Sequence, residues 1–134
     1  MYKYSCANGA YQLKLMDKVI VGEFSGAINE RMMASFVEQI AQMVQEHNLS
    51  QWGYIGDSLN VPAATPEAQQ HMVDIGNFMY SKGCKAIAFV LHSPIAINQL
   101  DKIRKQMGRT NDTRDIIFDN LDDALVYVNS FITQ

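Results

Sequence analysis

The sequence predicts an α/β fold: a mostly parallel sheet with an antiparallel hairpin at its N-terminal edge, in the order β-β-α-β-α-β-α-β-α. Three observations predict it. The segment CKAIAFVL, residues 84–91, is nearly all apolar, which is typical of a strand that helices cover on both faces of a parallel sheet. Short strands alternate with helical segments, which implies right-handed crossover connections. Two strand-like segments flank the turn Asp17-Lys18 and predict the hairpin.

The other predicted strands are short. Tyr11 to Met16, in which apolar and polar residues alternate, and Val19 to Phe24 form the hairpin. A central strand is expected from Trp52 to Asp57, and a last strand from Asp115 to Phe118. The segment 58–66, SLNVPAATP, is predicted as a loop after the central strand. Because the chain contains no internal repeat and no linker, residues 1–134 are expected to form one domain.

Four helices are predicted from apolar residues that recur at spacings of three and four. Each follows a residue whose side-chain oxygen can cap a helix: Asn29, Thr65, Ser93 and Asn120. The first helix is expected over roughly residues 30–47. In Thr65-Pro66-Glu67 the cap precedes a proline at the first helical position and an acid near the positive end of the helix dipole. The expected ends of the first three helices are Asn48, Gly83 and Gly108.

Charge and composition exclude several classes of protein. The formal net charge is −3, so no overall positive field attracts phosphate, and we expect no nucleic-acid partner. No apolar run reaches about 18 residues, so no transmembrane segment is expected. The start MYKYSCANGA lacks an apolar signal core, which predicts a cytoplasmic location. Cys6 and Cys84 are the only cysteines, and in the cytoplasm both thiols would be reduced.

The C-terminal half resembles a known family. CKAIAFVLHSPIAINQLDKIRKQMG followed by DIIFDNLDDALVYV resembles the STAS domain, the fold of bacterial anti-sigma factor antagonists and of the cytoplasmic tail of sulfate transporters. The ending FDNLDDALVYV is also similar to the small stand-alone SpoIIAA-like (STAS/SEC14-type) bacterial proteins. The resemblance covers about residues 10–132 and lies in the order of the motifs. It implies a non-enzymatic regulatory domain with a protein partner, and the SEC14-type relatives imply an apolar small molecule or lipid as the alternative ligand.

The family's phosphorylation motif is where this sequence departs. Antagonists of the sporulation type carry Asp-Ser-Ser-Gly at the start of the helix after the central strand, and a kinase phosphorylates the second serine. Here Ala63-Ala64-Thr65-Pro66 occupies that place, so Thr65 is the only hydroxyl, and Asp57-Ser58 lies several residues earlier. Ser58 and Thr65 are therefore the candidate phospho-switch positions. The competing interpretation of Thr65 is a helix cap, which alone accounts for Thr-Pro-Glu.

The loop after the central strand is also a candidate binding segment. Ligands commonly lie at the carboxyl edge of a parallel sheet, and the residues expected to contact a ligand or partner are Asp57, Asn60, Val61 and Pro62. This loop would gate an apolar cleft lined by some of the helix methionines, namely Met32, Met33, Met43, Met72 and Met79. The alternative is that these methionines belong to the core.

Basic residues concentrate near the end of the third predicted helix. Lys102, Arg104, Lys105, Arg109 and Arg114 fall within thirteen residues. They are either a solvated helix face or a docking patch for an acidic partner or anionic lipid head groups, and Lys102, Arg104, Lys105 and Arg109 are the residues expected to form that patch.

Signatures of catalysis and of cofactor binding are missing from the sequence. The histidines His47, His71 and His92 do not have metal-ligand spacing, and no GxGxxG, GxxxxGK or GxSxG motif occurs. No paired acid and base can be assembled, so we expect no catalytic residue, no metal and no cofactor. Two functions remain open: binding of a protein, with a homodimer as one form, and binding of an apolar small molecule or lipid.

Overall fold

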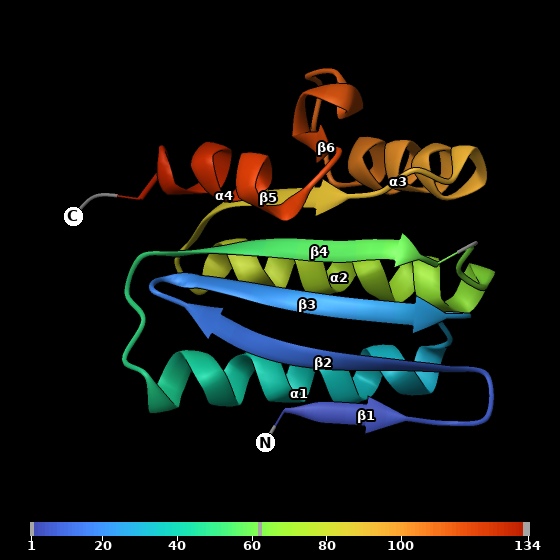
Figure 1. Ribbon diagram of the computed structural model, residues 1–134, viewed down its shortest axis with the longest axis horizontal. Coiled ribbons are helices and arrows are strands. Elements are labelled where there is room, and N and C mark those ends of the chain that lie inside the picture. The colour runs from blue at the N-terminus through green and yellow to red at the C-terminus, as the bar shows by residue number, and fades with distance from the viewer. Residues whose placement is uncertain (1, 62, 133–134) are drawn as a thin grey trace.

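The computed structural model describes residues 2–61 and 63–132, and within them it shows a six-stranded sheet flanked by helices (Figure 1). In chain order the elements are β1 (Lys3–Ser5), β2 (Gly9–Met16), β3 (Val19–Gly26), α1 (Glu30–Glu46), β4 (Trp52–Asn60), α2 (Pro66–Ser81), β5 (Cys84–Val90), α3 (Pro94–Gln106), the 3₁₀ helix η1 (Thr113–Ile116), β6 (Ile117–Phe118) and α4 (Leu121–Asn129). The strands lie in the sheet in sequence order. The first three pair antiparallel, and β3 to β6 pair parallel. The predicted fold class is confirmed.

Strand β1 extends the predicted hairpin by one strand. It pairs with β2 in the register Lys3 to Gln12, and the Tyr4 ring stacks on the Tyr11 ring with centroids 5.8 Å apart. Three residues are too few to show a period in the sequence. The structure therefore places β1, not β2, at the edge of the sheet.

Two other boundaries differ from the prediction. Strand β4 continues three residues past Asp57 to Asn60, and its last residues pair with β3 across a shift in register. The predicted last strand is shorter, because residues 113–116 form η1 and only Ile117–Phe118 pair with β5. The Asp112 carboxylate starts η1 by accepting a hydrogen bond from the Arg114 backbone N–H at 3.0 Å.

The predicted helix caps are confirmed. Their side-chain oxygens accept a backbone N–H three residues later in each case: Asn29 from Met32 at 2.9 Å, Thr65 from Ala68 at 3.1 Å, Ser93 from Ala96 at 3.2 Å and Asn120 from Asp123 at 2.8 Å. The predicted ends are confirmed too, because Asn48, Gly83 and Gly108 have the left-handed φ values 50°, 100° and 81°.

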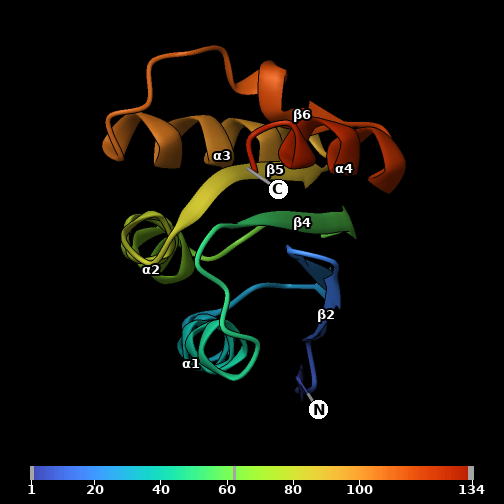
Figure 2. The same ribbon diagram turned by 90° about the vertical axis from the view of Figure 1, so that its left-hand side faces the viewer.

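Helices α1 and α2 lie together on one side of the sheet (Figure 2). The core on this side contains a chain of aromatic rings from β2, β3, α1 and β4, whose neighbouring centroids are 5.2–5.6 Å apart where Tyr11 meets Phe24, Phe24 meets Phe36, and Phe36 meets Tyr54. Such tilted contacts are favoured by the ring quadrupoles. Trp52 completes this core, and its indole N–H donates to the Lys82 carbonyl at 3.0 Å.

Helix α4 packs on the opposite face of the sheet. Its Ala124 and Val128 contact valine, isoleucine and alanine side chains of β3, β4 and β5. The approach is close at Gly53 of β4, where an added Cβ would lie 2.1 Å from a Val128 methyl, so the position needs glycine. Helix α3 lies beside α2 and packs against η1 through Leu100 and Ile116.

Candidate functional site

An apolar cavity of about 140 Å³ lies between the sheet and helices α1, α2 and α3. Aromatic and aliphatic side chains from strands and helices form most of its wall: Phe24, Tyr54, Ile87 and Phe89 from the strands, and Phe36, Ile75, Leu100 and Ile103 from the helices. Of the five methionines predicted for an apolar cleft, Met33, Met72 and Met79 line the cavity. Met32 and Met43 are buried in the core of α1 instead.

One end of the cavity lies near the carboxyl edge of the sheet, where Ser58, Val61 and Ala64 line it. Ser58 was expected in a loop, but it lies inside β4 and is 8% exposed. Tyr54, Gly56 and Ser58 all line the cavity, since alternate residues of a strand face the same side. A kinase cannot reach a hydroxyl that is buried in this way without opening the strand, so the prediction of Ser58 as an accessible loop serine is wrong.

The predicted binding loop is not one surface. Asp57 lies in β4 next to Glu23 of β3, on the face opposite the cavity. Asn60 is the last residue of β4, and Val61 is buried in the core. Pro62 lies outside the described residues. The loop predicted over residues 58–66 therefore begins later than expected, because β4 continues to Asn60, and contact of these residues with a ligand or partner stays a prediction.

The segment that follows is tied to two helices. The Gln99 side chain of α3 accepts from the Ala64 N–H at 2.9 Å and donates to the Ala64 carbonyl at 3.2 Å. The same carbonyl accepts from the Gln69 side chain at 3.1 Å, and the Thr65 N–H donates to the Ile28 carbonyl at 3.1 Å. These bonds fix the start of α2 against α3 and against Ile28, which lies just before α1.

Asp57 has an electrostatically unfavourable position. Partial burial and the neighbouring Glu23 carboxylate raise the pKa of the Asp57 carboxyl above its usual range, while a hydrogen bond from the Leu59 N–H and the charge of Lys14 lower it. Lys14 forms an ion pair with Glu23 at 3.6 Å, and the Gln12 amide donates to Glu23 at 2.7 Å. This face of the sheet carries polar groups that are partnered within the chain.

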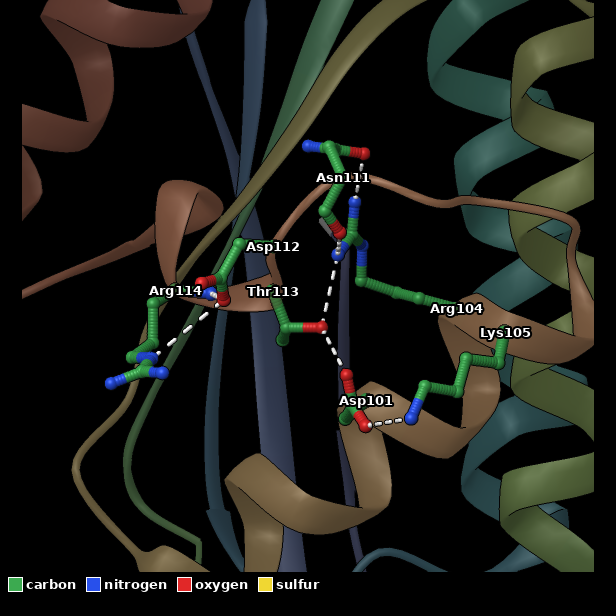
Figure 3. A network of polar contacts seen from close by, with 7 residues as sticks. All are labelled: Asp101, Arg104, Lys105, Asn111, Asp112, Thr113 and Arg114. Atoms are coloured by element: carbon green, nitrogen blue, oxygen red, sulfur yellow. Dashed lines mark hydrogen bonds and ion pairs between the residues drawn. The ribbon is translucent and has the colours of Figure 1, made fainter.

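The opposite end of the cavity lies between the C-terminal parts of α2 and α3. Arg104 of α3, predicted as a docking residue, is only 7% exposed. Its guanidinium donates to the Asn111 carbonyl at 3.0 Å, the Asn111 side-chain oxygen at 2.6 Å and the Thr113 hydroxyl at 2.9 Å (Figure 3). The prediction of Arg104 as a solvated docking side chain is therefore wrong, because it holds the segment between α3 and η1.

The remaining basic residues do not share one environment. Lys105 pairs with Asp101 one turn earlier at 2.9 Å, and Arg114 pairs with Asp112 at 3.7 Å. The Arg109 guanidinium lies over the Tyr80 ring of α2, 3.9 Å from its centroid, which is a cation–π contact. Lys102 is exposed on α3. The docking patch thus stays a prediction only for its exposed members, of which Lys105 and Arg109 already have partners in the chain.

Two histidines form exposed pairs with acids. His71 of α2 lies 3.7 Å from Glu30 of α1, and His92 lies 3.6 Å from Asp119. Within residues 2–61 and 63–132 no group of three or more His, Cys, Asp or Glu is arranged to hold a metal ion. None of the helices in these ranges is long and apolar enough to span a membrane.

Comparison with known proteins identifies the fold. No family model and no curated protein matches the sequence. Among solved structures, the chain is similar to an anti-sigma factor antagonist from Mycobacterium paratuberculosis, with 19% identity and a TM-score of 0.63 over 94% of this chain and 99% of that one. A DUF3478 protein with a SpoIIAA-like fold from Shewanella loihica matches with 11% identity and a TM-score of 0.64 over 93% and 98%. The chain has the SpoIIAA-like fold.

A third match is the Bacillus cell fate determinant SpoIIAA in its phosphorylated form, with 10% identity and a TM-score of 0.58 over 87% of this chain and 96% of that one. The SpoIIAA-like fold is the one that the sequence resemblance to STAS domains implied. Identities this low establish the fold alone. At the start of α2, where the family motif was expected, this chain has Thr65, whose hydroxyl is bonded as a helix cap.

Sequence reasoning missed two residues that line the cavity, Gln99 and Tyr80. Gln99 carries no pattern of its own, and Tyr80 was not assigned a role. Arg104 did leave a signal, because it stands four residues after Leu100 and next to Ile103 on the predicted buried stripe. A basic residue inside an apolar stripe is expected to be buried and partnered rather than free.

Proposed function

We propose that the chain is a non-enzymatic regulatory domain that acts by binding another protein. The observation that carries the proposal is an exposed apolar surface at the carboxyl edge of a SpoIIAA-like fold. Leu59 at the end of β4 and Ile95 in the first turn of α3 are both exposed, Ile95 by 63%. Leu59 belongs to β4, and Ile95 lies just after the neighbouring strand β5, so both are at the carboxyl edge of the sheet. Exposed apolar side chains that are surrounded by a polar rim are typical of the centre of a protein interface.

Rigid backbone supports this surface. Gln99 fixes Ala64 against α3, and an isolated parallel bridge joins Ala64 to Ile28 just before α1. A preorganised surface loses little conformational entropy on binding. The fold likeness to an anti-sigma factor antagonist supports a protein as the partner.

Binding in this proposal does not depend on phosphorylation. The Thr65 hydroxyl is bonded to the Ala68 N–H, and Ser58 is buried in β4. A phosphate on Thr65 would also lie close to Glu67 in the first turn of α2. Mass spectrometry of the protein from its native cell tests this point: we expect no phosphate at either residue, and a phosphate at either would contradict it.

A photo-crosslinking amino acid placed at Ile95 tests the docking surface in the native cell. The matched control is the same amino acid at Val126, which is 74% exposed on α4, an apolar position on another part of the surface. We expect one protein to be captured from position 95 and not from position 126. The mass of the adduct shows whether that protein is a second copy of this chain, the predicted homodimer.

Binding of the captured protein to Ile95→Ser and Val126→Ser variants completes the test. We expect about tenfold weaker binding for Ile95→Ser, the effect of a moderate hot spot, and no change for Val126→Ser. Capture from position 126 alone would show that the interface lies at α4 and would contradict the proposed surface. Capture from neither position would contradict the proposed function.

A second function, binding of a small apolar molecule, is supported by the cavity. Its volume of about 140 Å³ is close to the roughly 150 Å³ of an apolar cavity that holds benzene. Sites for drug-sized ligands measure about 300–1,000 Å³. The volume therefore favours a molecule with one small ring or a short branched chain over a lipid with long acyl chains.

A further inference from the structure

We infer that the cavity binds a small monocarboxylate, with its hydrocarbon part among the apolar side chains and its carboxylate between α2 and α3 at Arg109. The inference rests on the second proposed function and adds the charge of the ligand and the side from which it binds. Three observations support it: the charges that line the cavity, its size, and the contact between Arg109 and Tyr80 at this end.

Two charged side chains line the cavity within the described part of the chain. Both are arginines, Arg104 and Arg109. They lie at the same end, since the Arg109 N–H donates to the Arg104 carbonyl at 2.9 Å. The hydrogen-bond acceptors of the Arg104 guanidinium are neutral oxygens. The Asp101 carboxylate, which attracts Arg104 and accepts from the same Thr113 hydroxyl, is also paired with Lys105 at 2.9 Å. A buried cation with neutral acceptors leaves a positive field in a medium of low dielectric, which favours an anion at this end.

The size of the cavity limits the apolar part of the ligand. About 140 Å³ accommodates a single six-membered ring or a hydrocarbon chain of similar volume. The side chains around it include Met72, Met79 and Met107, whose unbranched, polarizable thioethers adapt to ligand shape. Benzoate has the required ring and a carboxylate at its edge, so it is a suitable probe.

Arg109 is the side chain that can admit such a ligand. It is exposed, and its guanidinium covers the Tyr80 ring at 3.9 Å without an ion pair among the described residues. A planar guanidinium binds a carboxylate through two parallel hydrogen bonds, which are stronger than a cation–π contact at the surface. On binding, the guanidinium moves from the ring to the carboxylate and covers the bound ligand.

The protein's own methionines report where a ligand binds. With ¹³C-labelled methionine methyl groups, titration with benzoate should shift the NMR signals of Met72, Met79 and Met107, because a benzene ring displaces the resonances of nearby nuclei. The signal of Met16, which is partly exposed on β2 away from the cavity, is the internal control. Benzyl alcohol, with the same ring and no charge, measures the contribution of the carboxylate.

The Arg109→Gln variant removes the charge at an exposed position and should fold normally. We expect it to weaken benzoate binding by about tenfold, the effect of losing a charge-assisted hydrogen bond, and to leave benzyl alcohol binding unchanged. Lys102→Gln, on the exposed side of α3, is the matched control and should bind benzoate as the wild type does.

The outcomes separate this inference from the function on which it rests. Shifts confined to the cavity methionines, with benzoate bound more tightly than benzyl alcohol and dependent on Arg109, support it. If both compounds bind equally and Arg109→Gln changes nothing, the carboxylate inference is wrong, whereas apolar binding stands. If neither compound shifts the cavity methionines at millimolar concentration, both are wrong.

Discussion

The Arg104 guanidinium donates to the Thr113 hydroxyl at 2.9 Å, and this hydroxyl donates its own proton to the Asp101 carboxylate at 2.7 Å (Figure 3). The direction of both bonds is fixed, because the guanidinium has no acceptor and the carboxylate has no proton. Thr113 thereby connects two residues of α3 to η1. It also holds the pKa of the Asp101 carboxyl below its usual range, with a smaller contribution from Lys105.

The stability of this network can be measured with Arg104→Met, which keeps much of the side-chain volume. We expect a loss of about 2–3 kcal/mol in the free energy of unfolding, because the buried Thr113 hydroxyl and the oxygens of Asn111 lose a charged donor. Urea denaturation measures it. The control Lys105→Met removes the exposed ion pair with Asp101 and should change stability by less than about 0.5 kcal/mol. Equal losses in both variants would contradict a structural role for Arg104.

Because Thr65 caps the start of α2, different substitutions at this position should change the free energy of unfolding by different amounts. Thr65→Ala should lower the free energy of unfolding by about 1 kcal/mol, since the Ala68 N–H loses its acceptor. Thr65→Ser and Thr65→Asp retain a capping oxygen and should stay within about 0.5 kcal/mol of the wild type. Thermal unfolding of the three variants side by side gives the comparison. A Thr65→Ser variant as unstable as Thr65→Ala would show that the hydroxyl does not act as a cap.

The two cysteines should differ in reactivity. Cys6 is exposed, whereas Cys84 is buried in β5 and its Sγ–H donates to the Ala86 carbonyl at 3.4 Å. Burial raises the pKa of the Cys84 thiol to about 12, so at pH 8 it remains protonated and unreactive. A disulfide reagent should titrate one thiol per chain in buffer and two in urea. The Cys6→Ser variant should show none in buffer, and a rapidly reacting thiol in that variant would contradict the burial of Cys84.

The raised pKa of the Asp57 carboxyl predicts that the stability of the protein changes with pH. Its folded-state pKa is raised above the usual value of 3.8, so the folded state binds the proton more tightly than the unfolded chain does. This contribution to stability is fully present below pH 3.8 and is lost as the pH rises through the folded-state pKa. Asp57→Asn should therefore raise the Tm at pH 7 and have a smaller effect at pH 3.

The Asp57→Asn experiment has a control on another surface. Asp74→Asn, on the exposed face of α2, removes the same charge from the protein without relieving a neighbouring acid in the sheet. Thermal unfolding from pH 3 to pH 8 compares both variants with the wild type. A stabilisation at pH 7 that both share would be an effect of net charge and not of the Glu23 neighbour.

The periodic parts of this fold could be predicted from the sequence. Caps such as Asn29 and Asn120 and the buried strand 84–90 follow local rules, and the structure confirms them. The strand boundaries that were predicted wrongly depend on pairing with residues that are distant in the sequence. Strand β4 continues through Ser58 because the end of β3 is there to pair with it, and β1 exists because β2 offers a free edge.

The candidate site was harder to predict for the same reason. The cavity is formed by side chains from three helices and the sheet, and no local pattern records which of them meet. Arg104 shows the limit clearly. Its neighbours along the chain include Lys102 and Lys105, which suggested a shared charged surface, yet its contacts are with Asn111 and Thr113.

Ser58 and Leu59 are consecutive in β4, but the Ser58 side chain faces the cavity, whereas Leu59 is exposed at the carboxyl edge of the sheet. Spectroscopic labels at these two positions would consequently report independent events. A label at 59 senses a protein that covers the carboxyl edge, while a label at 58 senses filling of the interior. One strand therefore provides two reporters, one residue apart, that distinguish the two proposed activities in a single sample.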